Sequence, residues 1–166
     1  MKVINLHRRI IHQSMESVSG LLQTLATKED KIWPFEHWPA IRFRDGLTVG
    51  SQGGHGLIGY TIIEYELRKS IKFKFTKPKG FNGAHQLVII PSDSKSVEIV
   101  HRIEMQTSGF ATTFWLLAVR WLHDALIEEA FDKLESNFSN ENNRITYSLW
   151  VRFLRYHLRP NKNRTS

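Results

Sequence analysis

The chain has 166 residues, of which 41% are hydrophobic and 23% charged, the composition of a single soluble globular domain. It has no cysteine, so disulfides, thiolate catalysis and cysteine-ligated zinc are excluded, and we expect a cytoplasmic protein. All sixteen acidic residues lie at or before Glu141, whereas six basic residues follow it. Most of the net charge of +7 therefore belongs to the tail, and we expect no nucleic-acid partner.

The N-terminal part of the chain is predicted to form a strand, two helices and a short strand. Lys2–His12 alternates and is rich in branched residues, which predicts a strand with Ile4, Leu6 and Ile10 on one face. A helix is predicted over 14–26, with Ser14 as its N-cap. A second short helix is predicted over Lys28–Trp33, and a short strand over Ala40–Arg44.

A glycine-rich segment, Gly50–Gly56 (GSQGGHG), lacks the GxGxxG pattern of dinucleotide-binding proteins. Its glycines suit either a tight hairpin or a mobile flap. Four more strands are predicted after it, over Leu57–Leu67, Ile71–Thr76, Ala84–Ile90 and Val97–Gln106. The last strand alternates most clearly, with an inward series of Val97, Ile99, His101, Ile103 and Met105.

The segment Phe110–Glu135 is predicted to form one long helix without Gly or Pro. Two apolar lines follow its length, one being Phe110, Phe114, Leu117 and Trp121, and the other Leu116, Val119, His123, Ile127, Phe131 and Leu134. So wide an apolar face needs contacts on most sides, which the upstream strands can provide. We therefore expect an α+β fold in which a curved antiparallel sheet wraps around this C-terminal helix.

The end of the chain is predicted to be a separate region. Ser136–Asn143 is a polar hinge, and Ile145–Leu158 predicts a short, basic, amphipathic tail helix. We expect a ligand-binding domain over residues 1–137, followed by the hinge and tail over 138–166. The tail helix could dock on its own domain, pair with a second copy as a homodimer, or lie on an anionic membrane surface, which would make the protein peripheral there.

Three motifs accompany this order of elements: GGHGLIGY at Gly53–Tyr60, KGFNGAH at Lys79–His85, and WLHDALIEE at Trp121–Glu129. Together with the order of elements, they resemble the helix-grip fold of the START-like (SRPBCC) superfamily, in its polyketide cyclase/dehydrase or lipid-transport-like branch. The resemblance covers residues 2 to about 137. It implies a deep apolar cavity between sheet and helix, in a fold that serves carriers, sensors and enzymes alike.

Four histidines are candidates for the wall of such a cavity: His55, His85, His101 and His123. Neutral imidazoles there could orient a polar group of a ligand or relay a proton. The alternative is that each is a core residue bonded to a backbone carbonyl. There is no HxH or HExxH spacing, so a zinc site would need distant parts of the chain to meet, and no metal is expected.

The long helix also carries Arg120, Asp124 and Glu128 at intervals of four residues. These residues could form a carboxylate pair with an arginine clamp at the mouth of the cavity, or simply a solvated polar stripe. Candidates for catalysis are accordingly His101, His123 and Asp124.

Three functions remain open at this point. The first is binding or carrying a small apolar or amphipathic ligand (a lipid, isoprenoid, polyketide or aromatic molecule) without a cofactor. Its predicted binding residues are Tyr60, Phe73, Phe75, His85, His101, Phe114, Leu117 and Trp121. The second is an enzyme of cyclase, dehydratase or hydrolase type that uses a cavity histidine as its base. The third is an interaction module recruited by its tail to a membrane or a partner.

Overall fold

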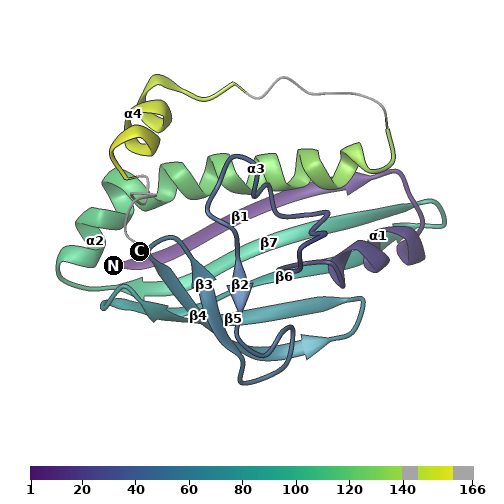
Figure 1. Cartoon of the computed structure of the whole chain (residues 1–166), viewed down its shortest axis with the longest axis horizontal. Helices are drawn as coiled ribbons and strands as arrows, with labels where there is room; N and C mark the ends of the chain where they lie inside the picture. The colour runs from purple at the N-terminus through teal and green to yellow at the C-terminus, as the bar shows by residue number, and fades with distance from the viewer. Residues whose placement is uncertain (140–145, 159–166) are drawn as a thin grey trace.

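In the computed structural model, which describes residues 1–139 and 146–158, a seven-stranded antiparallel sheet curves around a long helix (Figure 1). The elements are β1 (Lys2–Ile11), α1 (Met15–Leu22), β2 (Arg42–Phe43), β3 (Gln52–His55), β4 (Ile58–Glu66), β5 (Ser70–Lys77), β6 (Phe81–Asp93), β7 (Ser96–Thr107), α2 (Phe110–Phe114), η1 (Trp115–Val119), α3 (Arg120–Ser136) and α4 (Leu149–His157). The strand order is β1-β7-β6-β5-β4-β3-β2. The predicted α+β architecture is confirmed.

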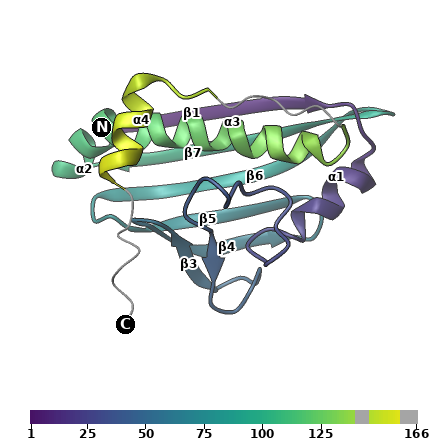
Figure 2. The ribbon, with the colours of Figure 1, turned by 45° about the horizontal axis from the view of Figure 1, so that its top comes forward.

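The helix layer lies on one face of the sheet, as the turned view shows (Figure 2). The predicted inward series of β7 is buried throughout and faces this helix layer; it comprises Val97, Ile99, His101, Ile103 and Met105. Apolar residues at every second position of a strand lie on the same side of the sheet, so this face becomes the core. From α3, Phe131 and Leu134 pack into the same core.

The edge strand β1 turns its polar side towards the helix. Ile4, Leu6 and Ile10 share one face, as predicted, but this face is the outer one, where their exposed fractions are 54%, 45% and 43%. The opposite side carries Asn5, His7 and Arg9, which contact α3. At this edge of the sheet, the contact between strand and helix is therefore made by polar and charged groups.

The polar contact between β1 and α3 repeats along both elements. Asn5 donates to Asp124 at 2.8 Å, His7 bonds Glu128 at 2.7 Å, and Arg9 bonds Asp132. Two residues of a strand advance by about 6.8 Å and four residues of a helix by about 6 Å, so the two repeats stay nearly in step. We call these six residues the β1–α3 seam.

The predicted long helix is confirmed as a nearly continuous rod, but it contains a π-helical turn, η1. A π-turn has i→i+5 bonds and holds one more residue than an α-turn, which rotates the downstream helix relative to the upstream part. Of the predicted apolar line, Phe110, Leu117 and Trp121 face outward, with exposed fractions of 81%, 58% and 42%, whereas Phe114 lines the cavity. Trp115 and Leu126 are buried instead.

Two smaller elements also differ from the prediction. Lys28–Trp33 is not helical, because the buried Asp30 carboxylate accepts hydrogen bonds from the backbone N–H groups of Ala26, Ile32 and Trp33 and holds an irregular loop. The strand predicted over Ala40–Arg44 shortens to β2.

The glycine-rich segment forms the hairpin β3–β4, as predicted. Gly54 is required there, since it has φ +147° and a Cβ would lie 2.1 Å from the Ile58 carbonyl oxygen.

The tail helix α4 begins at Leu149, with Ser148 as its N-cap, rather than at Ile145. Residues 140–145, which belong to the predicted hinge and the start of the predicted tail helix, lie outside the described residues. Within the described residues, no helix is long and apolar enough to cross a bilayer.

The orientation of the helix rod on the sheet can be tested. Phe131 is 1% exposed, so Phe131→Ala should lower the free energy of unfolding by about 3–5 kcal/mol through lost contacts and a cavity. The matched control Leu117→Ala, on the outward side of the same rod, should change it by less than about 0.5 kcal/mol. Urea unfolding measures both, and a larger loss for Leu117→Ala would contradict this orientation of the helix.

Candidate functional site

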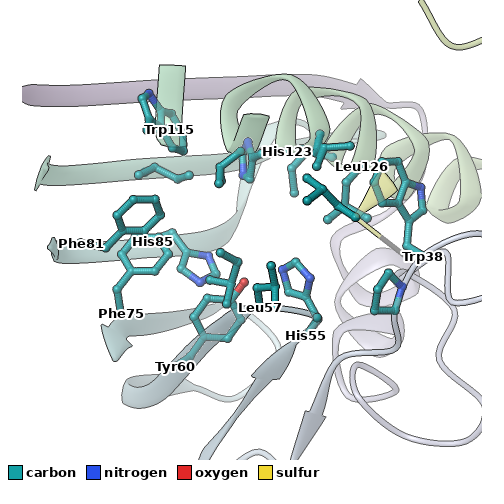
Figure 3. A pocket seen from close by; sticks show the side chains of 18 of the residues that line it. Trp38, His55, Leu57, Tyr60, Phe75, Phe81, His85, Trp115, His123 and Leu126 are labelled. Atoms are coloured by element: carbon teal, nitrogen blue, oxygen red, sulfur yellow. The ribbon is translucent and has the colours of Figure 1, made fainter. Parts of the chain in front are cut away.

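A cavity of about 150 Å³ lies between the sheet and the helix rod (Figure 3). Its floor is formed by β4–β7, its roof by the rod from Phe114 to Ile127, and its mouth by the 33–39 loop, β3–β4 and α4. Most of its wall is apolar or aromatic. The aromatic part consists of Trp33, Trp38, Tyr60, Phe75, Phe81, Phe114 and Trp115.

Strand register brings the aromatic wall together. The pairing of β4 with β5 sets Tyr60 opposite Phe75, and their ring centroids are 5.8 Å apart. The His85 ring is stacked on Phe75 at 5.0 Å, and Phe81 meets Trp115 of the helix rod edge-on at 6.1 Å. This continuous aromatic surface suits a flat, apolar ligand.

Among the described residues, five histidines line the cavity: the half-exposed His37, and His55, His85, His101 and His123. His85 of β6 and His101 of β7 bond to each other, Nδ1 to Nε2, at 3.1 Å. The ring of His123 on α3 lies 4.9 Å from that of His101. His55 lies apart from this row, between Trp33 at 4.6 Å and Tyr60 at 5.6 Å.

Several of these rings have nitrogens without partners. Within the described residues, His85 Nε2, His101 Nδ1 and both nitrogens of His123 are buried and have no hydrogen-bond partner. A buried polar atom without a partner costs about 1–3 kcal/mol, so a structure keeps such atoms when something else satisfies them. The alternative interpretation, in which each histidine bonds a backbone carbonyl, does not describe these three.

His85 and His101 are held neutral by their surroundings. Burial lowers the pKa of His85 and His101 well below the ordinary value, and the nearby histidines lower it further. Two neutral imidazoles joined by one hydrogen bond always leave one N–H donor and one bare acceptor at their far ends. The His85–His101 pair therefore offers a ligand one donor and one acceptor.

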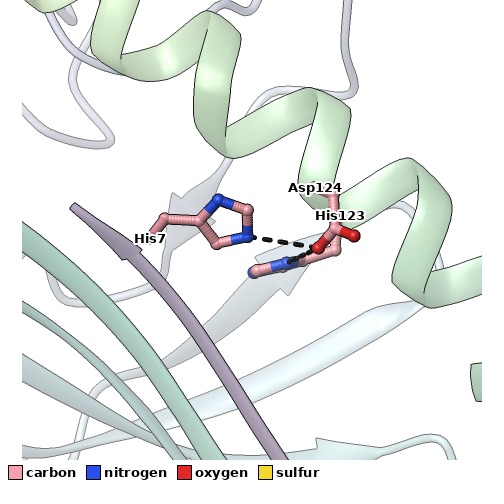
Figure 4. Close-up of side chains that lie close together, drawn as sticks. All are labelled: His7, His123 and Asp124. Atoms are coloured by element: carbon pink, nitrogen blue, oxygen red, sulfur yellow. Dashed lines mark hydrogen bonds and ion pairs between the residues drawn. The ribbon is translucent and has the colours of Figure 1, made fainter. Parts of the chain in front are cut away.

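Behind His123, the β1–α3 seam brings His7 and Asp124 together (Figure 4). His7 Nε2 lies 3.1 Å from Asp124 Oδ1, and His123 Nδ1 lies 3.6 Å from the same oxygen, too long for a hydrogen bond. Burial alone would raise the pKa of Asp124, but hydrogen bonds from neighbouring groups lower it overall. Burial lowers the pKa of His7, and its bonds to Asp124 and Glu128 outweigh this and raise it.

The mouth of the cavity is partly closed by α4. Arg155 and Leu158 line the cavity, and the Arg155 guanidinium lies over the rings of Trp38 at 4.5 Å and Tyr147 at 4.1 Å. Beneath them, the buried Glu129 carboxylate accepts hydrogen bonds from Trp38 Nε1 at 2.7 Å and from the Tyr147 hydroxyl. Although its sequence suggested a separate tail, α4 packs on the rod and on the cavity.

The structure places most of the predicted binding residues on the cavity wall: Tyr60, Phe75, His85, His101 and Phe114. Phe73 is buried in the core beneath it. The placement of Leu117 and Trp121 on the wall is corrected: both are exposed, because helical spacing puts them on the side of the rod away from the buried Trp115 and Ala118.

Other functional candidates could not be found in the sequence alone. Trp38 and Arg155 were missed because they reach the cavity from irregular or terminal segments. His7 was missed because its strand carried an apolar series on the opposite face, and that series was the clearer signal.

No protein-family model matches the sequence, and a comparison with curated protein sequences finds no significant match. Solved structures do match the fold. Norcoclaurine synthase from Thalictrum flavum superposes with a TM-score of 0.63 at 11% identity, covering 87% of this chain and 90% of that one. A Thermobifida fusca protein gives 0.62 at 13%, covering 87% and 99%. A START superfamily protein from Mycobacterium smegmatis gives 0.53 at 10%, covering 81% and 95%.

The protein has the helix-grip fold of the START-like (SRPBCC) superfamily. At these sequence identities the likeness concerns the fold, and the chemistry has to be argued from the cavity itself. In this helix-grip protein, the features available for that chemistry are the aromatic wall of the cavity and its neutral histidines.

The buried histidines predict that acid destabilises the protein. Burial, with a smaller effect of His123, lowers the pKa of His55 from 6.5 to about 3. As the pH falls below the pKa of His55 in the unfolded chain, the unfolded chain gains a proton that the folded chain does not. The free energy of unfolding is therefore highest above that pKa. Below it, the free energy of unfolding decreases by about 1.4 kcal/mol per pH unit for each such histidine.

Urea unfolding of the wild type and of His55→Gln, from about pH 7.5 to about pH 5, measures this linkage. The variant should lose stability less steeply with falling pH. The difference between the two proteins at the upper pH, where His55 is neutral in both states, reports lost contacts only and is the internal control. Identical slopes would show that His55 takes up its proton equally in both states.

Proposed function

We propose that the protein binds a small, mainly apolar molecule of about the size of one aromatic ring, with a single polar group directed at the cavity histidines. The observation that carries this proposal is the set of unpartnered histidine nitrogens in an otherwise apolar cavity. A cavity without such atoms would accept any apolar molecule of the right size. A cavity with unpartnered nitrogens favours a molecule that can form hydrogen bonds with them.

The volume of the cavity limits the ligand. At about 150 Å³ it is comparable to an engineered apolar cavity that binds benzene, and it is smaller than the 300–1,000 Å³ or so that is usual for drug-sized ligands. Of the ligand classes open from the sequence, a monocyclic aromatic molecule or a comparably small one fits best. A long acyl chain or a polycyclic molecule would require the cavity to widen.

A polar group on the ligand would meet a donor and an acceptor together. A phenolic hydroxyl can both donate and accept, so it matches the two free ends of the His85–His101 pair. Tyr60 adds a hydroxyl that points into the cavity (Figure 3). The solved norcoclaurine synthase structure, which has the same fold, is a complex with dopamine and hydroxybenzaldehyde, both small aromatic molecules with hydroxyl groups.

The proposal is tested with p-cresol and toluene, which differ by one hydroxyl. We expect both to bind the wild type, and p-cresol to bind about 5- to 10-fold more tightly, as one well-made buried hydrogen bond allows. Titration calorimetry or protein NMR measures both affinities. His101→Leu should remove the preference for p-cresol while keeping an affinity for toluene.

A second pair of variants locates the binding site. Leu126→Trp fills the cavity from the rod and should abolish binding of both probes, whereas Leu117→Trp, on the outward face of the same rod, should leave it unchanged. Binding that survives Leu126→Trp in a folded protein would place the ligand elsewhere. An equal affinity for p-cresol and toluene would remove the role of the histidines.

An enzymatic role is the second candidate, and the His85–His101 hydrogen bond favours it. If one free end of the pair gives up a proton and the other takes one, both rings exchange tautomers and no net charge is left in the cavity. Such a pair could act as acid and base at once on a small carbonyl or hydroxyl compound, as cyclase, dehydratase or hydrolase chemistry needs. Turnover that His101→Asn abolishes, with probe binding retained, would favour this role.

The position of α4 suggests how a ligand enters. Arg155 is held by two aromatic rings and donates to the His37 carbonyl oxygen at 2.7 Å, so α4 must move for the mouth to widen. We expect Arg155→Ala to speed the release of p-cresol by about 2- to 30-fold, because a cation–π contact is worth about 0.5–2 kcal/mol. NMR line-shape analysis measures the rate. The control Arg152→Ala, exposed on the same helix, should leave it unchanged; equal effects would argue against a lid.

Recruitment of the tail to an anionic membrane stays a prediction. Val151 and Leu154 of α4 are buried, whereas Leu149 and Tyr156 are 81% and 78% exposed. The helix could therefore contact a lipid surface with its outer side while its inner side covers the cavity.

A further inference from the structure

The β1–α3 seam places three metal-binding side chains around one point. A nitrogen of His7, a nitrogen of His123 and a carboxylate oxygen of Asp124 all lie within 4.8 Å of one another. His7 comes from β1, and the other two are neighbours on α3, so the arrangement exists only when the seam is formed (Figure 4). These are the distant parts of the chain that a metal site in this sequence would need.

The spacing fits a transition-metal ion. Ligand atoms at about 2.0–2.1 Å from a tetrahedral Zn²⁺ lie about 3.3 Å from each other. The distances to Asp124 Oδ1 are 3.1 Å from His7 Nε2 and 3.6 Å from His123 Nδ1. The separation between the two histidine nitrogens is within 4.8 Å.

His123 supplies an independent indication that a ligand is missing. Within the described residues, neither of its ring nitrogens has a hydrogen-bond partner, and neither has exposed surface. The imidazole is a strong ligand once its lone pair is directed at a metal, and here Nδ1 is turned towards the Asp124 carboxylate without bonding it. A bound ion would satisfy this nitrogen.

The surroundings also resemble the outer shell of a metal site. Glu128 Oε1 lies 2.7 Å from His7 Nδ1, so this nitrogen can donate to the carboxylate and leave Nε2 free for a metal. Asn5 Nδ2 donates to Asp124 Oδ1 at 2.8 Å and fixes the carboxylate. The side chains of Asp124 and Glu128 are 33% and 48% exposed, which gives an ion access from solvent.

We propose that His7, His123 and Asp124 form a binding site for a divalent transition-metal ion such as Zn²⁺. Two imidazoles and one carboxylate suit such an ion better than Ca²⁺ or Mg²⁺, which prefer six or more oxygen ligands. Three protein ligands leave a fourth tetrahedral position for water. The ion would join β1 to α3 directly behind the cavity wall, because His123 belongs to both.

The test begins with ZnCl₂ titrated calorimetrically into the chelator-treated full-length protein. We expect one Zn²⁺ per chain, a higher melting temperature with Zn²⁺, and reversal by a chelator. Each of His7→Ala, His123→Ala and Asp124→Asn should abolish stoichiometric binding, and Glu128→Gln should weaken it by about 10- to 100-fold. His12→Asn, just beyond the other end of β1, is the matched control and should bind as the wild type does.

A second measurement needs no variant. Co²⁺ bound at a tetrahedral site gives an intense visible absorption that an octahedral hydrated ion lacks, and Zn²⁺ should remove it whereas Mg²⁺ should not. The proposal is overturned if the wild type shows no stoichiometric Zn²⁺ binding. It is equally overturned if the Zn²⁺ affinity survives in folded Asp124→Asn, or if His12→Asn removes it, since the ion would then sit elsewhere.

Discussion

The contact between β1 and α3 determines how the rest of the molecule is arranged. An apolar helix face on an apolar sheet can slide or rotate at little cost, because hydrophobic contact has no direction. Hydrogen bonds from Asn5, His7 and Arg9 to carboxylates spaced along α3 do have direction. They fix the rotation of the helix about its axis and its position along β1. Arg9 also lies over the Phe131 ring at 5.7 Å, which joins the seam to the core.

In this orientation of α3, the two sides of the His123 ring face different groups. On one side its ring forms part of the cavity wall beside His101, and on the other it faces Asp124 and His7. A change at either side, such as a ligand in the cavity or an ion at the seam, would act on the same imidazole. The cavity and the seam thus share one side chain, His123.

The cavity itself combines two opposing properties. Its aromatic wall stabilises the fold by burying apolar area, whereas its neutral histidines leave polar atoms unsatisfied at a cost in stability. Protonating any of these buried histidines would lower the stability further, since burial disfavours the imidazolium. The ligand that we propose for this cavity would be selected mainly by whether it supplies the missing hydrogen bonds.

The sequence by itself determined features that depend on local periodicity and backbone freedom: the inward series of β7 with His101, the continuous helix rod, and the hairpin at Gly54. Alternation in a strand shows which residues share a face, but not which face meets the core. In β1 the polar face points inward because α3 offers it polar and charged partners. The helix rod has apolar residues on its outward side as well, so its composition did not show that Leu117 faces solvent; only packing against the sheet, which buries Trp115 and Ala118, decided this.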